Sequence, residues 1–198
     1  WIKRKVDGQS YSAPDELFGA KLADRHVHPI VGYDETVCTP QMGETGPWFN
    51  RLPHFLMDFT PSTGAELQSE FFVPRKHATK AMGALYGLHH ELKHVLQISE
   101  IRTIKGDSNW MSTAEGGDRV AFHFTWVKDW SRVVAVLPLV EEALSPFDAR
   151  PHWGKVTTLR PKVLQSRYPR LNEFRALAKQ LDPTGKFRND YLNKYIGG

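Results

Sequence analysis

The segment RVAFHFTWV at residues 119–127 constrains the fold more than any other stretch of the chain. Every second residue of this segment is a large apolar one, and together these residues form one side of it: Val120, Phe122, Phe124 and Trp126. Successive side chains of a β-strand point to opposite faces of a sheet, so the apolar side must be covered by a core. The other side carries the polar residues His123 and Thr125. We therefore expect a sheet with one packed face and one face that presents polar side chains.

Similar patterns on both sides of this segment predict the order of the elements. In chain order they are a strand at 66–73, a helix at 76–94, a strand at 96–105, the strand at 119–127, a helix at 129–144 and a strand or its lead-in at 147–156. This is the split βαβ, ferredoxin-like order. The predicted fold class is α+β: an antiparallel sheet with helices on one face, followed by a C-terminal helical segment.

Composition and charge exclude several classes of protein. The 198 residues carry a net charge of +4 without a dense run of Lys and Arg, so nucleic-acid binding is not expected. No apolar run is long enough to span a membrane. Cys38 is the single cysteine, which rules out an intrachain disulfide and favours a reducing, cytoplasmic location. The sequence opens on Trp1 rather than Met, so a targeting signal is not visible.

Polar side chains gather on one side of two predicted strands. On 96–105, alternation places Glu100 and Arg102 on one face between apolar residues. If this strand pairs with 119–127, these two residues join His123 and Thr125 on one surface of the sheet. A Glu100–Arg102 surface pair and a structurally satisfied His123 are the alternative interpretation.

The stretch FDARPHWGK at 147–155 adds a positively charged edge to this surface. It contains Arg150, His152 and Lys155, held in place by a rigid Pro and a Trp. Glu and Thr can hydrogen-bond hydroxyl groups, Arg and Lys can hold oxygens, and His can accept a proton. Such a set suits an uncharged, polyhydroxylated ligand better than a phosphate, for which no Gly-rich loop is present. A turn anchored by its Trp is the alternative here.

A competing motif lies on the first predicted helix. His90, Glu91 and His94 form a literal HExxH, the spacing that places two zinc-binding imidazoles and a general base on one helix face. Gln97 stands where the extended motif needs Gly, and the helix ends close to His94. A polar helix end near its negative dipole explains the same residues. A zinc peptidase therefore stays an alternative of a different class.

Three segments resemble the alditol (xylitol) oxidases, flavoproteins of the vanillyl-alcohol-oxidase superfamily that are close to the sugar-1,4-lactone oxidases. They are FHFTW at 122–126, PFDARPHWGK at 146–155 and LDPTGKFRN at 181–189. Both groups share the RPHWGK element. The matches at 46–62 and 100–102 favour the alditol oxidases.

The resemblance implies the C-terminal, substrate-domain part of an FAD-dependent alcohol oxidase. Residues 1–156 would form the substrate-binding (cap) domain, and 157–198 would return to an FAD-binding domain outside this chain. FAD would be bound mainly by that missing domain, so we expect the chain alone to bind FAD weakly and to be inactive. The reaction would oxidise the C1 hydroxyl of xylitol or sorbitol to the aldehyde, with molecular oxygen reduced to hydrogen peroxide.

The resemblance also assigns roles to the polar residues. The polyol hydroxyls would be bound by Glu100, Arg102, Thr125 and Lys155. His123 and Lys155 would help remove the hydroxyl proton while a hydride passes to the flavin, and His152 would approach the flavin. An aldonolactone oxidase and a non-catalytic sugar-binding module are the remaining alternatives.

Overall fold

The computed structural model describes residues 1–9, 11–60 and 64–197, and the chain forms two compact units, 1–61 and 62–198. Most of the first unit consists of turns and loops. Its short elements are the strands β1 (Glu16–Leu17) and β2 (Ala20–Lys21) and the 3-10 helices η1 (Glu35–Val37) and η2 (Trp48–Asn50). None of these elements in the described residues of the first unit is longer than three residues.

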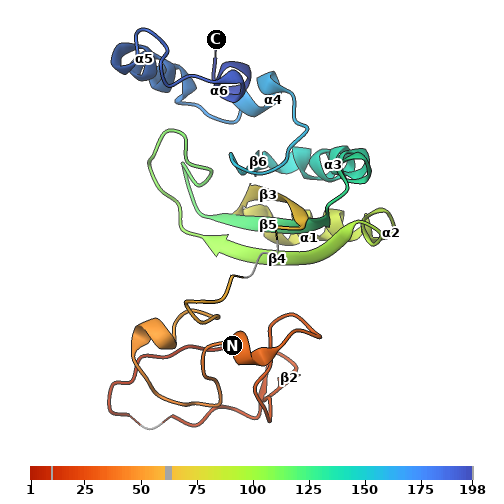
Figure 1. The fold of residues 1–198 in the computed structure, drawn as a ribbon, viewed down its shortest axis with the longest axis vertical. Coiled ribbons are helices and arrows are strands. Elements are labelled where there is room, and N and C mark those ends of the chain that lie inside the picture. Colours follow the sequence, from red (N-terminus) through yellow and green to blue (C-terminus); the bar gives the residue numbers. More distant parts are fainter. Residues whose placement is uncertain (10, 61–63, 198) are drawn as a thin grey trace. The chain divides into compact units, whose positions relative to one another are not determined.

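The second unit contains a four-stranded antiparallel sheet (Figure 1). Its strands are β3 (Glu66–Pro74), β4 (Leu96–Ile104), β5 (Arg119–Val127) and β6 (Arg150–Pro151). They lie in the order β4-β5-β3-β6, with every neighbouring pair antiparallel. The predicted fold class is confirmed, including the position of the strand at 119–127.

Helices precede and follow these strands. They are η3 (Arg75–His77), α1 (Ala78–Tyr86), α2 (His89–Leu92), α3 (Trp130–Leu144), η4 (Ser145–Phe147), α4 (Pro161–Gln165), α5 (Leu171–Leu181) and α6 (Asp190–Tyr195). The prediction of a single helix at 76–94 is wrong. Helix α1 ends before Gly87, a residue that favours a helix end, and the separate helix α2 begins at His89. The strand expected within 147–156 is only two residues long, since Pro151 offers no N–H and a turn follows it.

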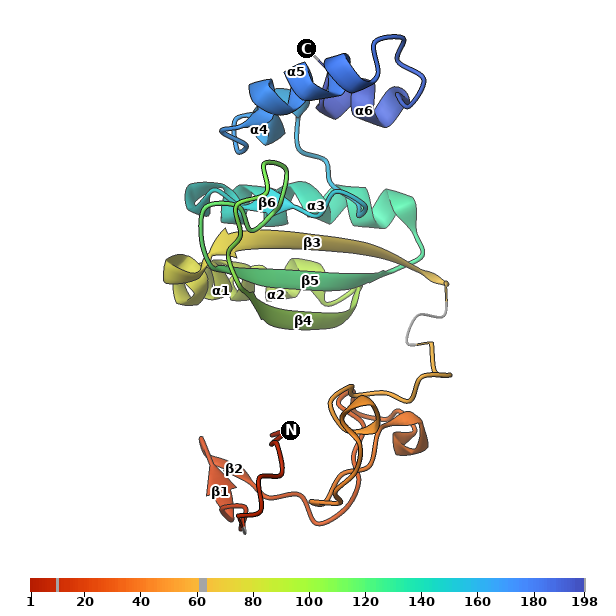
Figure 2. The ribbon, with the colours of Figure 1, turned by 90° about the vertical axis from the view of Figure 1, so that its left-hand side faces the viewer.

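One face of the sheet is covered by helices (Figures 1 and 2). A single core cluster joins strand residues such as Phe71, Phe122 and Trp126 to Leu85 of α1 and Leu137 of α3. Burial of each large apolar side chain stabilises the fold by roughly 1.5–3 kcal/mol. The packed face predicted from the alternation on β5 is therefore present, and the opposite face is left to the polar side chains.

The helix α3 begins where the sequence predicts it. The Oδ1 of Asp129 accepts a hydrogen bond from the backbone N–H of Arg132 at 3.1 Å, the usual N-cap contact. Further along α3, the carboxylate of Glu141 is buried and accepts hydrogen bonds from Thr157 Oγ1 and the backbone N–H of Thr158, both at 2.7 Å. This carboxylate fixes the segment that leaves the sheet for the C-terminal helices.

The C-terminal helices form a second, smaller core. It contains Leu164, Tyr168, Leu171 and Tyr195, with Met111 and Trp153 packed against them. Trp153 lies in the turn after β6, so these helices support that turn. In the part of the chain that the structure describes, no helix combines the length and the apolar character needed to cross a bilayer.

Gly106, which follows β4, gives a test of this packing. A Cβ at this position would lie 2.4 Å from the backbone carbonyl carbon of Gly117, so Gly106→Ala forces the backbone to shift. We expect Gly106→Ala to lower the free energy of unfolding by about 1–3 kcal/mol in urea denaturation. Gly83→Ala, in helix α1 with open space around the added Cβ, should instead raise it by about 0.5–1 kcal/mol. Equal effects of the two substitutions would contradict this packing.

Candidate active site

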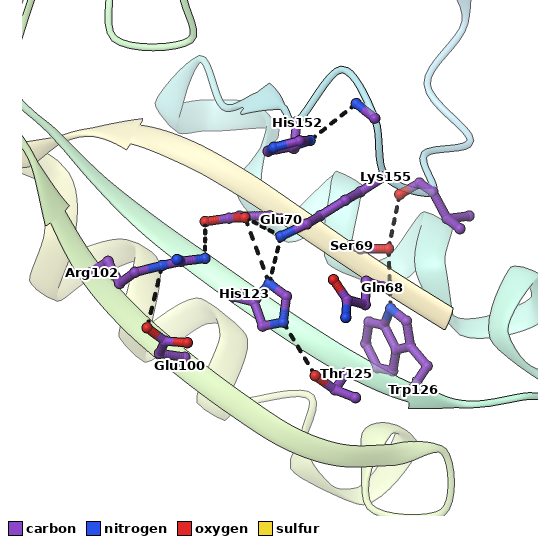
Figure 3. Close-up of polar contacts among 12 residues, drawn as sticks. Gln68, Ser69, Glu70, Glu100, Arg102, His123, Thr125, Trp126, His152 and Lys155 are labelled. Atoms are coloured by element: carbon purple, nitrogen blue, oxygen red, sulfur yellow. Dashed lines mark hydrogen bonds and ion pairs between the residues drawn. The ribbon is translucent and has the colours of Figure 1, made fainter. Parts of the chain in front are cut away.

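The open face of the sheet carries a row of polar residues across its three long strands. The register pairs Glu70 of β3 with His123 of β5, and His123 with Glu100 of β4. Thr125 follows His123 by two positions and Arg102 follows Glu100 by two positions, so alternation along each strand puts both on the same face. The sheet thus brings together the four strand residues predicted from sequence, and adds Glu70 (Figure 3).

Lys155 reaches this row from the turn after β6. The backbone N–H of His152 donates to the carbonyl of Glu70, and that of Val156 donates to the carbonyl of Gln68, both at 2.8 Å. Between these two bonds the chain makes a turn, which is closed by a hydrogen bond from Lys155 N to the carbonyl of His152 at 3.2 Å. The turn therefore projects the Lys155 side chain over the sheet, where Nζ lies 3.0 Å from His123 Nδ1.

Glu70 is the centre of the cluster, and sequence reasoning missed it. Its side chain is 4% exposed, with Oε1 accepting from Arg102 Nη2 at 2.7 Å and Oε2 from Lys155 Nζ at 2.5 Å. The Oε2 atom also lies 3.6 Å from His123 Nδ1. The available signal was a carboxylate on the non-core side of an otherwise buried strand, which calls for a partner.

The pKa of Glu70 is strongly lowered by these contacts. Burial alone raises the pKa of a carboxyl group, but the contacts with His123 and Lys155 and the charges of Lys155 and Arg102 outweigh it. The resulting pKa of Glu70 is about 2. Glu70 is therefore ionised at neutral pH and is a poor proton acceptor.

His123 is buried and is held at both ring nitrogens. Nδ1 faces the Lys155 ammonium, and Nε2 lies 3.2 Å from the hydroxyl oxygen of Thr125. A protonated Lys155 can only donate hydrogen bonds, so Nδ1 accepts from it. The proton of a neutral imidazole then lies on Nε2. Nδ1 is then the atom through which a neutral imidazole takes a proton from Lys155.

Glu100 and Arg102 do form the surface pair that was one interpretation of their spacing. Arg102 Nε lies 3.4 Å from Glu100 Oε1, and the two side chains are 44% and 54% exposed. Arg102 also binds the buried Glu70, so the pair is joined to the cluster. Its exposed atoms remain available to a ligand on the open face.

His152 lies beside Lys155 but takes no part in that network. Its Nδ1 accepts from the backbone N–H of Gly154 at 3.0 Å, and its ring stacks on Phe72 at a centroid distance of 6.3 Å. Burial, followed by the charge of Lys155, lowers the pKa of His152. His152 is therefore a neutral, oriented imidazole at neutral pH.

A shallow recess lies next to the cluster. It encloses about 600 Å³ and is lined by Glu66, Leu67, Gln68, His152, Trp153, Gly154, Lys155, Val156 and Tyr191. Tyr191 of α6 donates to the carbonyl of Trp153 at 2.7 Å, so the C-terminal helices help to form this wall. Lys155 is the residue common to the recess and the network.

Two predicted features lie outside the cluster. Arg150 does not line the recess: it is buried and donates to Glu115 Oε2 at 3.0 Å, which makes it structural. In the HExxH segment, α2 ends at Leu92, so His94 does not share a helix face with His90. Among residues 1–9, 11–60 and 64–197, no group of three or more His, Cys, Asp or Glu side chains is arranged to hold a metal ion.

Comparison with known proteins identifies relatives of this chain. A family described as D-arabinono-1,4-lactone oxidase matches residues 62–195. An alditol oxidase from Streptomyces sp. is 48% identical over 198 residues, which is 100% of this chain and 47% of that protein. An L-gulono-1,4-lactone dehydrogenase from Mycobacterium tuberculosis is 30% identical over 134 residues, 66% of this chain and 30% of that protein.

A long-chain alcohol oxidase from an uncultured marine euryarchaeote is 38% identical over 119 residues, covering 57% of this chain and 25% of that protein. The chain thus spans about half the length of the alditol oxidase, and less of the other two. The family match covers the sheet, the turn with Lys155 and the C-terminal helices. The chain belongs to the D-arabinono-1,4-lactone oxidase family.

Proposed function

We propose that this chain is the substrate-side part of an FAD-dependent alditol oxidase. The full protein would oxidise the C1 hydroxyl of a polyol such as xylitol or sorbitol to the aldehyde and reduce molecular oxygen to hydrogen peroxide. One observation carries this proposal: Lys155 Nζ lies 3.0 Å from His123 Nδ1 on the open face of a sheet, in a chain 48% identical to an alditol oxidase along its whole length. The single, buried Cys38 supports a reducing, cytoplasmic location.

The proposal assigns substrate binding and FAD binding to different parts of the full protein. Residues 1–156 form the substrate-binding domain in this proposal, and 157–198 return to an FAD-binding domain. The sequence has no Gly-rich loop for phosphates, so FAD is held mainly by the half of the alditol oxidase length that this chain does not cover. The residues here fit the redox end of the cofactor, because His152 offers a neutral, oriented ring beside the recess.

The charges of the cluster favour an uncharged substrate. Arg102 and Lys155 carry two positive charges, and Glu70 and Glu100 carry two negative ones, so the set is formally neutral. Glu100 accepts hydrogen bonds from hydroxyl groups, Arg102 donates to their oxygens, and Thr125 can do both. A polyol, with alternating donors and acceptors, satisfies this set without bringing a net charge to it.

The contacts of Lys155 support a route for the hydroxyl proton. An ammonium has no lone pair, so Lys155 can accept the proton of the C1 hydroxyl only as it passes one of its own protons on. As the O–H bond breaks, its proton passes to Lys155 Nζ, while a proton of that ammonium passes to His123 Nδ1 along the 3.0 Å contact. FAD, when bound, supplies the acceptor for the hydride that leaves C1.

An aldonolactone oxidase is the second candidate, because the matching family and the mycobacterial relative are described by lactones. The test is hydrogen peroxide formation by the full-length protein with xylitol, sorbitol or a sugar 1,4-lactone. We expect the polyols to give the higher kcat/KM. A higher value with the lactone would favour the second candidate, and polyol binding without peroxide would favour a sugar-binding module.

Replacement of Lys155 tests the proton route. In the full-length protein, Lys155→Met should slow flavin reduction by xylitol at least about 100-fold, because it removes the ammonium donor and the link to His123. It should also lower the urea midpoint, because the buried Glu70 carboxylate loses one of its partners. Anaerobic stopped-flow absorbance measures the rate. The matched control Lys80→Met, on the exposed side of α1, should leave it unchanged; equal rates for both variants would refute the role of Lys155.

Replacement of Glu100 tests substrate binding. Glu100→Gln keeps the shape but loses the charge that strengthens hydrogen bonds to hydroxyl groups, so KM should rise about three- to tenfold. Steady-state oxygen consumption should show little change in kcat, because the proton route does not include Glu100. Glu91→Gln, on α2, is the control. A large fall in kcat with an unchanged KM would contradict a binding role.

A further inference from the structure

Glu70 contacts three residues of the proposed site, and the proton route proposed above does not include it. It lies in the middle of β3 and receives Arg102 on one oxygen and Lys155 on the other. The same oxygen that binds Lys155 faces His123 Nδ1 at 3.6 Å. A carboxylate that is 4% exposed is thus surrounded by one arginine, one lysine and one imidazole.

The fold does not account for a carboxylate at this position. Buried ion pairs contribute little net stability, and apolar side chains of similar volume often replace them without loss. On the same side of β3, the neighbouring positions are occupied by Gln68 and Phe72, which are uncharged. The chain also contains a structural pair, Arg150 with Glu115, in which one carboxylate serves one guanidinium away from the cluster.

We propose that Glu70 is a positioning residue for the oxidation, an inference that rests on the proposed function. Its carboxylate holds Lys155 Nζ against His123 Nδ1 and compensates the positive charge that the hydroxyl proton brings to this pair. Glu70 itself neither touches the substrate nor takes the proton. It acts through Lys155 and His123.

The charge balance of the proton step explains why a carboxylate is needed. Before the step, Lys155 is an ammonium and His123 is neutral. The O–H bond of the substrate breaks, Lys155 gains that proton and gives another to His123, so the pair ends with two positive charges. An ionised carboxylate next to both groups offsets the second charge. The low pKa of Glu70, about 2, keeps it ionised throughout.

Removal of this charge shifts the pH dependence in a definite direction. In Glu70→Gln, the protonated forms of Lys155 and His123 lose a stabilising negative charge and give up their protons at lower pH. His123 must be neutral before the step, so the acid limb of the rate profile moves to lower pH. Lys155 must be protonated, so the basic limb also moves to lower pH. Both limbs should move by about one pH unit.

The experiment measures the limiting rate of flavin reduction by xylitol between pH 5 and 10, with pH values about half a unit apart, in the full-length protein. Glu70→Gln should lower this rate about 10- to 100-fold, change KM less, and shift both limbs downward. Glu70→Asp keeps the charge on a shorter stem, so it should restore part of the rate and the original pH profile. Glu115→Gln, the matched control, should lower the urea midpoint but leave rate and profile unchanged.

The outcomes separate this inference from the function on which it rests. A wild-type protein whose flavin xylitol does not reduce would overturn the proposed function and this role with it. An active wild-type protein with a Glu70→Gln variant of the same rate and profile would overturn the role of Glu70 alone. If Glu70→Gln does not fold, Glu70→Asp is the deciding variant. Its carboxylate is shorter by one methylene, so a wild-type rate of flavin reduction in this variant would contradict the positioning role.

Discussion

The site depends on one ion pair, between Glu70 in β3 and Lys155 in the turn after β6. These residues are 85 positions apart in the chain. The 2.5 Å contact between Lys155 Nζ and Glu70 Oε2 fixes the long, flexible lysine side chain over β3. Because both groups are largely removed from solvent, loss of either one leaves the other charge without its partner. The pair also holds Lys155 Nζ next to His123, while Arg102 binds the other oxygen of the same carboxylate.

The rest of the unit holds the two ends of that pair in place. The apolar side of β5 and β3 packs on α1 and α3, which fixes the height of the polar row above the core. The turn that carries Lys155 is held by Trp153, whose Nε1 donates to the carbonyl of Met111 at 2.9 Å and whose ring packs against Tyr168. The C-terminal helices therefore serve the site as well as their own small core.

The sequence predicts the parts of this arrangement that depend on local pattern. Period-two alternation identified the two faces of β5, and the Asp129 cap identified the start of α3. Glu70 was missed because its importance arises from register: only the pairing of β3 with β5 places it opposite His123. Arg150 was misinterpreted because charge alone does not distinguish a ligand-facing guanidinium from one bound to Glu115.

If Glu70 and Lys155 act as one unit in the proton step, their effects on its rate are not additive, and a double-mutant cycle measures this. The rates of flavin reduction by xylitol are compared for the wild-type full-length protein, Glu70→Gln, Lys155→Met and the double variant. Residues that act as a unit have non-additive effects, so the double variant should be about as slow as Lys155→Met alone. A double variant slowed by the product of the two single effects would contradict the account.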